Sequence, residues 1–228
     1  MNKISDTIRN RIEKAGAAYF CNDNISEFIY NDTELELLQD EVQEKMQGVL
    51  ESLVIDTAHD HNTNETAKRV AKMYVNEIFS GRYIAAPRVT SFPNAQSYDQ
   101  LYIVGPVDVR STCAHHFQNI IGKAWVGVFP GNNVIGLSKF NRIIDHIASR
   151  PQIQEEMTVQ IADEIESITQ AEGIAVVMKA EHCCMTHRGV KAHESDMVTS
   201  VMRGALRDQH KLREEFFSLL QGMKGYKV

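Results

Sequence analysis

Apolar residues in the first third of the chain recur with the period of an α-helix. One such face runs over residues 4–12 and a longer one over residues 35–53. Thr33 and Glu36 stand before the longer face with the spacing of a capping box, so that helix is predicted to begin there. A third helix is predicted over residues 64–81, between a capping asparagine and a terminating glycine.

After Pro87 the pattern changes to that of β-strands. Residues 102–111 alternate in part between apolar and polar, and residues 120–129 are rich in β-branched and aromatic side chains. Two later strands are predicted over residues 174–180 and 197–201. The chain should therefore consist of a helical first region and a second region built around a sheet.

Helices separate the two pairs of predicted strands. Ser138 is the expected cap of a helix ending near residue 149, and Pro151 suits the first turn of the next helix. Residues 134–137 are expected to extend the sheet, and a last helix is predicted over residues 209–220. The order strand, strand, helix, helix, strand, strand favours antiparallel pairing, because it contains only one helical crossover. We therefore predict an α+β protein.

Composition and charge narrow the class of protein. The chain has 228 residues, of which 43% are hydrophobic and 24% charged, as in an ordinary soluble globular protein. Its net charge of −6 argues against a nucleic-acid-binding protein, which usually carries a basic surface. No stretch approaches the ~20 apolar residues that cross a bilayer, and the first residues lack the apolar core of a signal peptide. Two of the four cysteines are adjacent, which suits reduced thiols, so we expect a cytoplasmic protein without a membrane anchor.

Two short segments, Ser111–Phe117 and Glu181–Gly189, concentrate the metal-binding chemistry of the chain. Their candidate ligands are Cys113, His115, His116, His182, Cys183, Cys184 and His187. Thiolate and imidazole are ligands that zinc prefers; three protein ligands with an open position form a catalytic site, and four form a structural one. If Cys113, His116 and Cys184 meet, an ion there would lie beside two further histidines. A buried core thiol is the alternative for Cys113, and spacing alone leaves the ligand set open.

Basic residues near predicted helix starts are candidates for binding an anion. Ser138, Lys139 and Arg142 lie where a strand becomes a helix, and a helix N-terminus favours phosphate. On the pattern alone, a solvated helix face explains these three residues better. Arg188, beside the second Cys/His segment, is the stronger candidate for a phosphate fork. Glu155 fits first-turn helix electrostatics, although a carboxylate is also the acceptor that a guanine edge requires.

Several of these segments together resemble one known family, GTP cyclohydrolase I. Its four signature stretches are similar to Ser111–Phe117, Gly136–Arg142, Arg150–Glu155 and His182–Val190, and further similarity lies in Ala71–Gly81 and Leu212–Phe216. The match runs from about residue 35 to residue 220. Separate motifs in the same order make the resemblance far more specific than any one of them.

The resemblance implies a fold, a reaction and an assembly. Residues 1–87 would form an N-terminal helical region, and residues 88–228 a catalytic tunnelling-fold domain. In that domain two helices lie between the middle strands of an antiparallel four-stranded sheet. The implied reaction converts GTP to 7,8-dihydroneopterin triphosphate and formate, the first step of pterin and tetrahydrofolate biosynthesis. The family assembles as a toroidal homodecamer with its active sites between subunits.

The resemblance also implies a role for each candidate residue. Zn²⁺ would be held by Cys113, His116 and Cys184, with His115 and His182 transferring protons. Glu155 would hold the guanine edge with Gln154 close by. The residues implied in binding the triphosphate are Ser138, Lys139, Arg142, Arg188 and, from a neighbouring subunit, Arg69.

The chain departs from the family pattern at two places. Ala114 stands where the family has an acidic residue, and Ala67-Lys68 stands where it has Pro-His before Arg69. Loss of a carboxylate beside a metal ligand can be costly, which leaves two alternatives to the implied reaction open. One is a tunnelling-fold homologue acting on another purine or pterin. The other is a catalytically silent, zinc-stabilised oligomer that binds nucleotide. A structural zinc site would need a fourth ligand such as Cys183 or His187.

Overall fold

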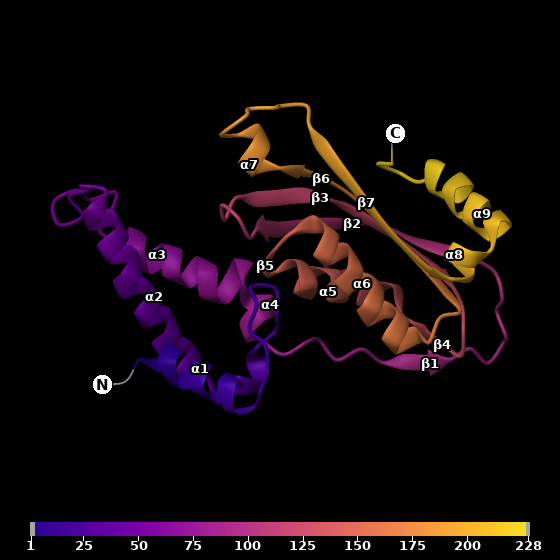
Figure 1. The fold of residues 1–228 in the computed structure, drawn as a ribbon, viewed down its shortest axis with the longest axis horizontal. Helices are drawn as coiled ribbons and strands as arrows, with labels where there is room; N and C mark the ends of the chain where they lie inside the picture. Colours follow the sequence, from indigo (N-terminus) through magenta and orange to yellow (C-terminus); the bar gives the residue numbers. More distant parts are fainter. Residues whose placement is uncertain (1–2, 227–228) are drawn as a thin grey trace. The chain divides into compact units, whose positions relative to one another are not determined.

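The computed structural model describes residues 3–226 and divides the chain into two compact units, Met1–Ala85 and Ala86–Val228 (Figure 1). The first unit consists of helices and the second contains every strand, so the predicted α+β class is confirmed. Among the described residues, no helix is long and apolar enough to cross a membrane.

Helices of the first unit enclose a small apolar cluster. They are α1 (Ile4–Lys14), η1 (Ser26–Phe28), α2 (Asp32–Ser52), α3 (Thr66–Met73), η2 (Tyr74–Ile78, a π-helical turn) and α4 (Ser80–Tyr83). The face predicted at residues 4–12 is confirmed, because Ile8 and Ile12 are buried against Ile25. Helices α1 and α2 are also joined by a two-pronged ion pair, in which Arg11 donates to both carboxylate oxygens of Glu34 at 2.7 Å.

The predicted starts of two helices were wrong. Helix α2 is capped by Asn31, whose side-chain oxygen accepts the N–H of Glu34 at 3.0 Å and so satisfies one of the free amides at the helix start. Thr33 therefore lies inside the helix rather than capping it. Helix α3 begins at Thr66 after Glu65, and the glycine predicted to end this helix lies within α4.

The second unit is organised around a five-stranded sheet with the order β5-β2-β3-β6-β7. Its strands are β2 (Tyr102–Cys113), β3 (Asn119–Phe129), β5 (Pro151–Gln152), β6 (Gly173–His182) and β7 (Asp196–Gly204). All neighbours are antiparallel except β5, which pairs with β2 in parallel. The four strand positions predicted from the sequence are confirmed, and β5 is an addition.

Three local predictions in this unit were wrong. Pro151 belongs to β5, and helix α6 starts only at Gln154, because the chain first pairs with the end of β2. Strand β4 (Asn133–Ile135) does not extend the main sheet but forms a separate pair with β1 (Ser91–Pro93). The cap of α5 is Gly136 rather than Ser138, which lies within the first turn.

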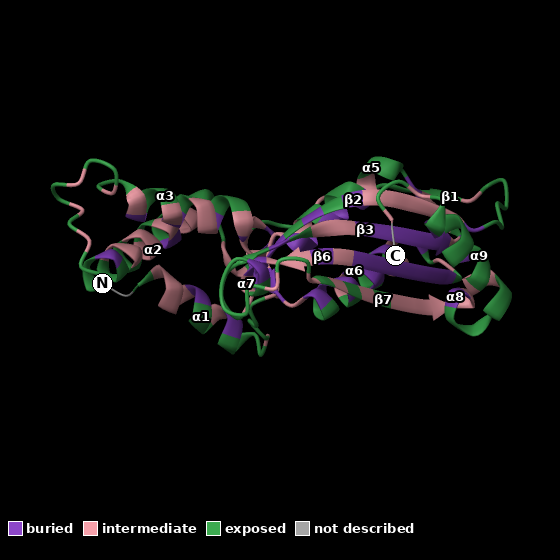
Figure 2. Cartoon of the chain, turned by 90° about the horizontal axis from the view of Figure 1, so that it is seen from above, coloured by how far each residue is buried: buried purple, intermediate pink, exposed green. Residues whose placement is uncertain are grey.

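Helices cover both faces of the main sheet (Figures 1 and 2). They are α5 (Leu137–Ala148), α6 (Gln154–Thr169), α8 (Ala205–Asp208) and α9 (His210–Gln221). Helices α5 and α6 bury the larger core against one face, including Phe140, Met157 and Ile161. On the other face Phe216 of α9 packs with Trp125. Figure 2 shows the resulting band of buried residues along β3 and β6.

Antiparallel pairing brings three segments of the main sheet to one end. Cys113 ends β2, Asn119 begins β3, and His182 ends β6, where it lies opposite Ile120. The short helix α7 (Cys183–Thr186) follows directly. The two Cys/His segments predicted from the sequence therefore meet at this end of the sheet.

Candidate metal centre and active site

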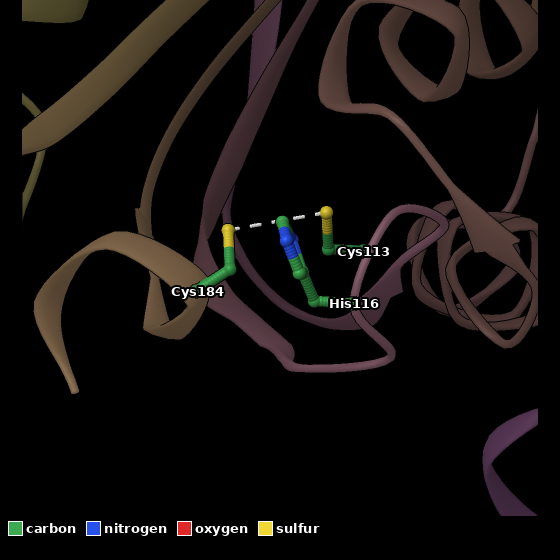
Figure 3. Close-up of side chains that lie close together, drawn as sticks. All are labelled: Cys113, His116 and Cys184. Atoms are coloured by element: carbon green, nitrogen blue, oxygen red, sulfur yellow. Dashed lines mark hydrogen bonds between the residues drawn. The ribbon is translucent and has the colours of Figure 1, made fainter. Parts of the chain in front are cut away.

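Cys113, His116 and Cys184 form a compact cluster of metal-ligand atoms at this end of the sheet, with each potential ligand atom within 4.8 Å of the others. Figure 3 shows their side chains converging from the end of β2, the following turn and α7. The turn is closed by the N–H of Phe117, which donates to the carbonyl of Cys113 at 2.9 Å. Phe117 has a φ of 53°, a left-handed conformation that reverses the chain, and the N–H of Cys113 then donates to the carbonyl of Gln118 at 2.8 Å.

The geometry of this cluster fits a tetrahedral metal ion. The Cys113 and Cys184 sulfur atoms lie 3.9 Å apart. Two thiolates bound at about 2.3 Å to a tetrahedral zinc ion would be about 3.8 Å apart. Two sulfurs and an imidazole nitrogen are also a donor set that zinc prefers. Among the described residues the cluster holds three ligands, and Cys183 and His187 belong to a different group.

The electrostatic environment of Cys184 makes metal binding at this cluster depend on pH. Burial, and then the neighbouring Cys113 sulfur, raise the pKa of the Cys184 thiol, while the positive charge of Arg188 acts in the opposite direction. A thiol with a raised pKa must lose its proton to become a metal ligand, so metal affinity should rise with pH. The opposing effect also indicates that the Arg188 charge acts at the cluster.

His182 is held by a buried amide that fixes its tautomer. The amide nitrogen of Gln154 lies 3.1 Å from the carbonyl of Met197 and 3.0 Å from the hydroxyl of Thr199. Because the nitrogen points toward these acceptors, the other amide atom, Oε1, faces His182 Nε2 at 2.8 Å. A carbonyl oxygen only accepts, so His182 Nε2 carries the hydrogen, and Nδ1 of the neutral ring is left with a free lone pair.

The partners of Gln154 are residues that sequence reasoning missed. Gln154 and Thr158 are completely buried, and the Thr158 hydroxyl lies 2.7 Å from that of Thr199 on β7. Threonine spacing within one helix and one distant strand gives no signal in a single sequence. The nearest available signal was the polar Gln154 on the helix face that also carries Met157, Ile161 and Ile165. In this structure Gln154 positions His182, and a contact between Gln154 and substrate stays a prediction.

Three further candidate residues lie around this end of the sheet. Burial lowers the pKa of His182, and the negative charge of Glu155 in the first turn of α6 opposes this effect. His115 is exposed, with its ring centroid 6.5 Å from that of His116. Arg188 is exposed just after α7. These residues are thus arranged around the cluster, with a carboxylate, an imidazole and a guanidinium open to solvent.

The proposed triphosphate residues on α5 lie toward the opposite end of the sheet, with Arg142 in the middle of the helix. Helix α5 starts after β4, beyond the far end of β3, and its last turn leads to β5 beside Cys113 (Figure 1). With 12 residues the helix is about 18 Å long. Ser138 and Lys139 are in its first turn, and the Lys139 ammonium donates to the carbonyl of Arg88 at 3.3 Å. Within one chain Ser138 and Lys139 therefore lie away from the metal cluster.

Arg69 lies in the first unit, on the exposed side of α3.

Residues 42–221 match the profile of the family described as GTP cyclohydrolase I. The chain therefore belongs to this family of α+β proteins, and the resemblance drawn from the sequence motifs is confirmed.

Individual relatives agree with this assignment. The GTP cyclohydrolase 1 of Haemophilus ducreyi is 41% identical over 193 residues, covering 82% of this chain and 88% of the relative. That of Actinobacillus pleuropneumoniae serotype 5b is 41% identical over 181 residues, covering 79% and 83%. Among solved structures, the apo form of the archaeosine synthase QueF-Like aligns with a TM-score of 0.35 and 12% identity, over 53% of this chain and 97% of that one.

Proposed function

We propose that this protein is a GTP cyclohydrolase I, which converts GTP to 7,8-dihydroneopterin triphosphate and formate. The observation that carries the proposal is the three-ligand cluster of Cys113, His116 and Cys184 in a chain that belongs to this family. A three-ligand site keeps a coordination position open for chemistry. The second unit, with its antiparallel sheet and the helices α5 and α6 between the middle strands, is in this proposal a tunnelling-fold catalytic domain.

The metal of this site is proposed to be Zn²⁺, held by two thiolates and the His116 imidazole. When bound, zinc supplies a Lewis acid that makes water a nucleophile at neutral pH. Each of the four cysteines is free in the structure, including both proposed ligands. Thiols that must remain reduced to bind metal suit a reducing compartment, so we infer a cytoplasmic location.

Proton transfer is assigned to His182 and His115. Because Gln154 accepts the hydrogen of His182 Nε2, the atom of His182 that takes up and returns a proton is Nδ1. Burial lowers the pKa of His182, which keeps the ring neutral and able to accept a proton near neutral pH. His115 is exposed and provides a second imidazole for the steps in which the ribose opens and the pterin ring closes.

Substrate recognition is assigned to polar and charged residues on α3, α5 and α6 and just after α7. The Glu155 carboxylate would accept the N1–H and amino hydrogens of guanine, a pairing that needs two acceptor oxygens on one group. The triphosphate would bind Ser138, Lys139, Arg142, Arg188 and Arg69. Ser138 and Lys139 lie about 14–15 Å of helix, and Arg142 about 9 Å of helix, from the end of α5 that approaches Cys113. This separation supports an active site completed by a second copy of the chain, in a homo-oligomer such as a decamer.

The direct test is to incubate zinc-loaded protein with GTP and to measure formate together with oxidised, fluorescent neopterin. We expect both products, and their loss on chelation and in Cys184→Ala. Formate without neopterin would show that ring opening proceeds and the rearrangement fails, which contradicts the roles given to the two histidines. Intact GTP with zinc bound would contradict the proposed reaction.

Ala114 favours one alternative function. The family pattern has an acidic residue here, and in this chain the position offers only its backbone N–H, which donates to the carbonyl of Gln152 at 3.1 Å. A missing carboxylate beside a ligand could alter which purine reacts. A screen in which another purine nucleotide is turned over faster than GTP would support this alternative, and Ala114→Glu should then shift the preference toward GTP.

A further inference from the structure

A second group of metal-ligand atoms lies beside the first and shares no residue with it. Glu181, Cys183 and His187 place a carboxylate oxygen, a sulfur and a ring nitrogen within 4.8 Å of one another. We call these three residues the second donor cluster. Nothing in the proposed reaction uses them, and the sequence offered Cys183 and His187 only as a fourth ligand for a structural zinc site.

Chain geometry explains why the two clusters are separate. Side chains alternate between the faces of a strand, so Glu181 leaves the opposite face of β6 from His182, which bonds to Gln154 of α6. Cys183 and Cys184 are consecutive in α7, and consecutive helical residues point about 100° apart. Cys184 turns toward Cys113, whereas Cys183 turns toward Glu181 and His187.

The ligand atoms of the second donor cluster have the spacing of a metal site. The Glu181 oxygen and the His187 Nδ1 are 3.7 Å apart. An oxygen and a nitrogen bound at about 2.1 Å to a tetrahedral zinc ion would be separated by about 3.4 Å. The Thr186 hydroxyl donates to Glu181 at 2.6 Å and lies 2.9 Å from His187 Nδ1, so one side chain contacts two of the proposed ligands, and an ion would take the place of Thr186 at Nδ1.

The charge of Glu181 and the exposure of His187 also suit the binding of a metal ion. Among the ion pairs of the described residues, Glu181 is joined only to His187, while the nearby Lys179 is paired with Asp196 at 3.2 Å. The carboxylate is therefore not neutralised by a lysine or arginine. Cys183 is 7% exposed, whereas the His187 side chain is 68% exposed. An ion can thus approach from the His187 side and meet a protected sulfur.

We propose that Glu181, Cys183 and His187 form a second binding site for a divalent transition-metal ion, of the class of Zn²⁺ and Co²⁺. The mixed oxygen, sulfur and nitrogen donors suit borderline ions and exclude Mg²⁺ and Ca²⁺, which require oxygen ligands. Three protein ligands leave a position for water or a small anion. The ion would tie the end of β6 to the segment after α7, and so hold the turn that carries Cys184.

The test is to strip the full-length protein of metal and to titrate it with Co²⁺ alone, without GTP. Thiolate-to-cobalt charge-transfer absorption follows the number of bound sulfurs, so the two sites can be told apart. We expect two equivalents per chain, one with two sulfurs and one with a single sulfur. Cys113→Ser should weaken the first of these, and Glu181→Gln and His187→Gln should each remove the second.

His193→Gln is the matched control, because His193 is exposed in the same segment and belongs to neither cluster. It should keep both equivalents. A single equivalent that depends on Cys113 and is unaffected by His187→Gln would overturn the proposal, as would two equivalents that persist in both Glu181→Gln and His187→Gln. Using two single-residue variants guards against misfolding of one, and circular dichroism checks each. The number of Co²⁺ ions bound per chain is measured without turnover, so the result is independent of whether GTP is the substrate.

Discussion

At the residue scale, the contact between Gln154 and His182 makes the strongest mechanistic prediction. Gln154→Leu keeps the approximate volume but removes the acceptor for His182 Nε2–H and the donor for Met197 and Thr199. Leaving buried acceptors unpaired should lower the free energy of unfolding by about 1–3 kcal/mol. Turnover should fall by part of the ~10²–10⁴-fold that general acid–base catalysis contributes. Neopterin formation and urea unfolding measure the two effects, while metal content should stay unchanged.

A matched control is Thr199→Val, which removes one acceptor of the Gln154 amide and leaves the Gln154–His182 contact in place. It should lower stability by about 1 kcal/mol and change turnover little. If Gln154→Leu and Thr199→Val lowered turnover equally, the effect would be structural, and the role given to the tautomer of His182 would be wrong.

The same residues show what sequence reasoning can reach at this scale. The ligand cluster of Cys113, His116 and Cys184 was expected because thiols and imidazoles are scarce and their segments carry a family pattern. Gln154 was expected to contact substrate, whereas in the structure it contacts His182. Its neighbours are set by the packing of α6 against β7, and a pairing between distant segments leaves no mark in local spacing.

At the element scale, the contact of β3 with β6 predicts a stability effect at Gly122. A Cβ built there would lie 2.2 Å from the carbonyl oxygen of Lys179 and 2.5 Å from the Cβ of Ala180. Because these atoms belong to the neighbouring strand, Gly122→Ala should push β6 away and destabilise the protein by about 1–3 kcal/mol. Metal affinity should also fall, since β6 leads directly to Cys184. Urea unfolding and metal titration provide the measurements.

Gly48→Ala is the control for that substitution. Gly48 lies within α2, and a Cβ there would meet no atom within 4 Å. Alanine favours the helix over glycine by up to about 1 kcal/mol, so this change should stabilise the first unit and leave metal affinity unaltered. Equal effects of the two substitutions would contradict the close approach of β3 and β6.

Helix α5 contains a histidine that should make stability depend on pH. Burial, and then the positive charge of Arg150, lower the pKa of His146 from 6.5 to about 4. Its Nε2 is buried without a partner among the described residues. The other charged groups lining the adjacent cavity are Asp163 and Glu164. The folded protein therefore disfavours the imidazolium that the unfolded chain readily forms.

The direction in which stability changes with pH follows from proton uptake on unfolding. Above about pH 6.5 the histidine is neutral in both states, and its contribution is fully present; as pH falls toward 4, the unfolded state binds the proton first and stability is lost. Allowing for partial exposure, the loss should be roughly 1–2 kcal/mol. His146→Gln should flatten this part of the stability–pH curve. An unchanged curve in the variant would show that other groups cause the acid dependence.

Helices and strands were predicted correctly from the sequence where the hydrophobic pattern extends over many residues, and incorrectly where they begin or end. The strands β2, β3, β6 and β7 were placed within a few residues, because their β-branched runs are long. Strand β5 has two residues and is defined only by its partner β2, so it resembles the start of a helix. The cap of α2 was missed because Asn31 and Thr33 are both good capping residues and only backbone geometry selects between them.

At the scale of the whole molecule, part of the proposed triphosphate site lies far from the metal ligands of the same chain. The metal ligands sit at one end of the main sheet, and Lys139 sits at the other, with α5 between them. Lys139 lies about 14 Å along the helix before the last residue of α5, a separation that a rotamer change does not span. If the metal ligands and Lys139 act on one GTP molecule, we infer that the triphosphate binds α5 of a second copy, and single-chain sequence patterns cannot reveal that arrangement.

Subunit mixing tests this directly. Cys184→Ala and the double variant Lys139→Ala/Arg142→Ala should each be nearly inactive alone. In mixed oligomers, a site is complete when its metal-binding chain and its triphosphate-binding chain are both intact at those positions. Random mixing at equal amounts makes this true for about one site in four, so activity should recover to about a quarter of wild type.

The control mixture is Cys184→Ala with Cys113→Ser, which should remain inactive because both residues come from the same chain at every site. The two mixtures therefore differ only in whether the lost functions belong to one chain or to two. If mixed oligomers form and the first mixture also stays inactive, the residues on α5 do not serve the metal site of another copy. The triphosphate would then have to bind nearer the cluster, with Arg188 as the remaining cation whose charge acts on Cys184.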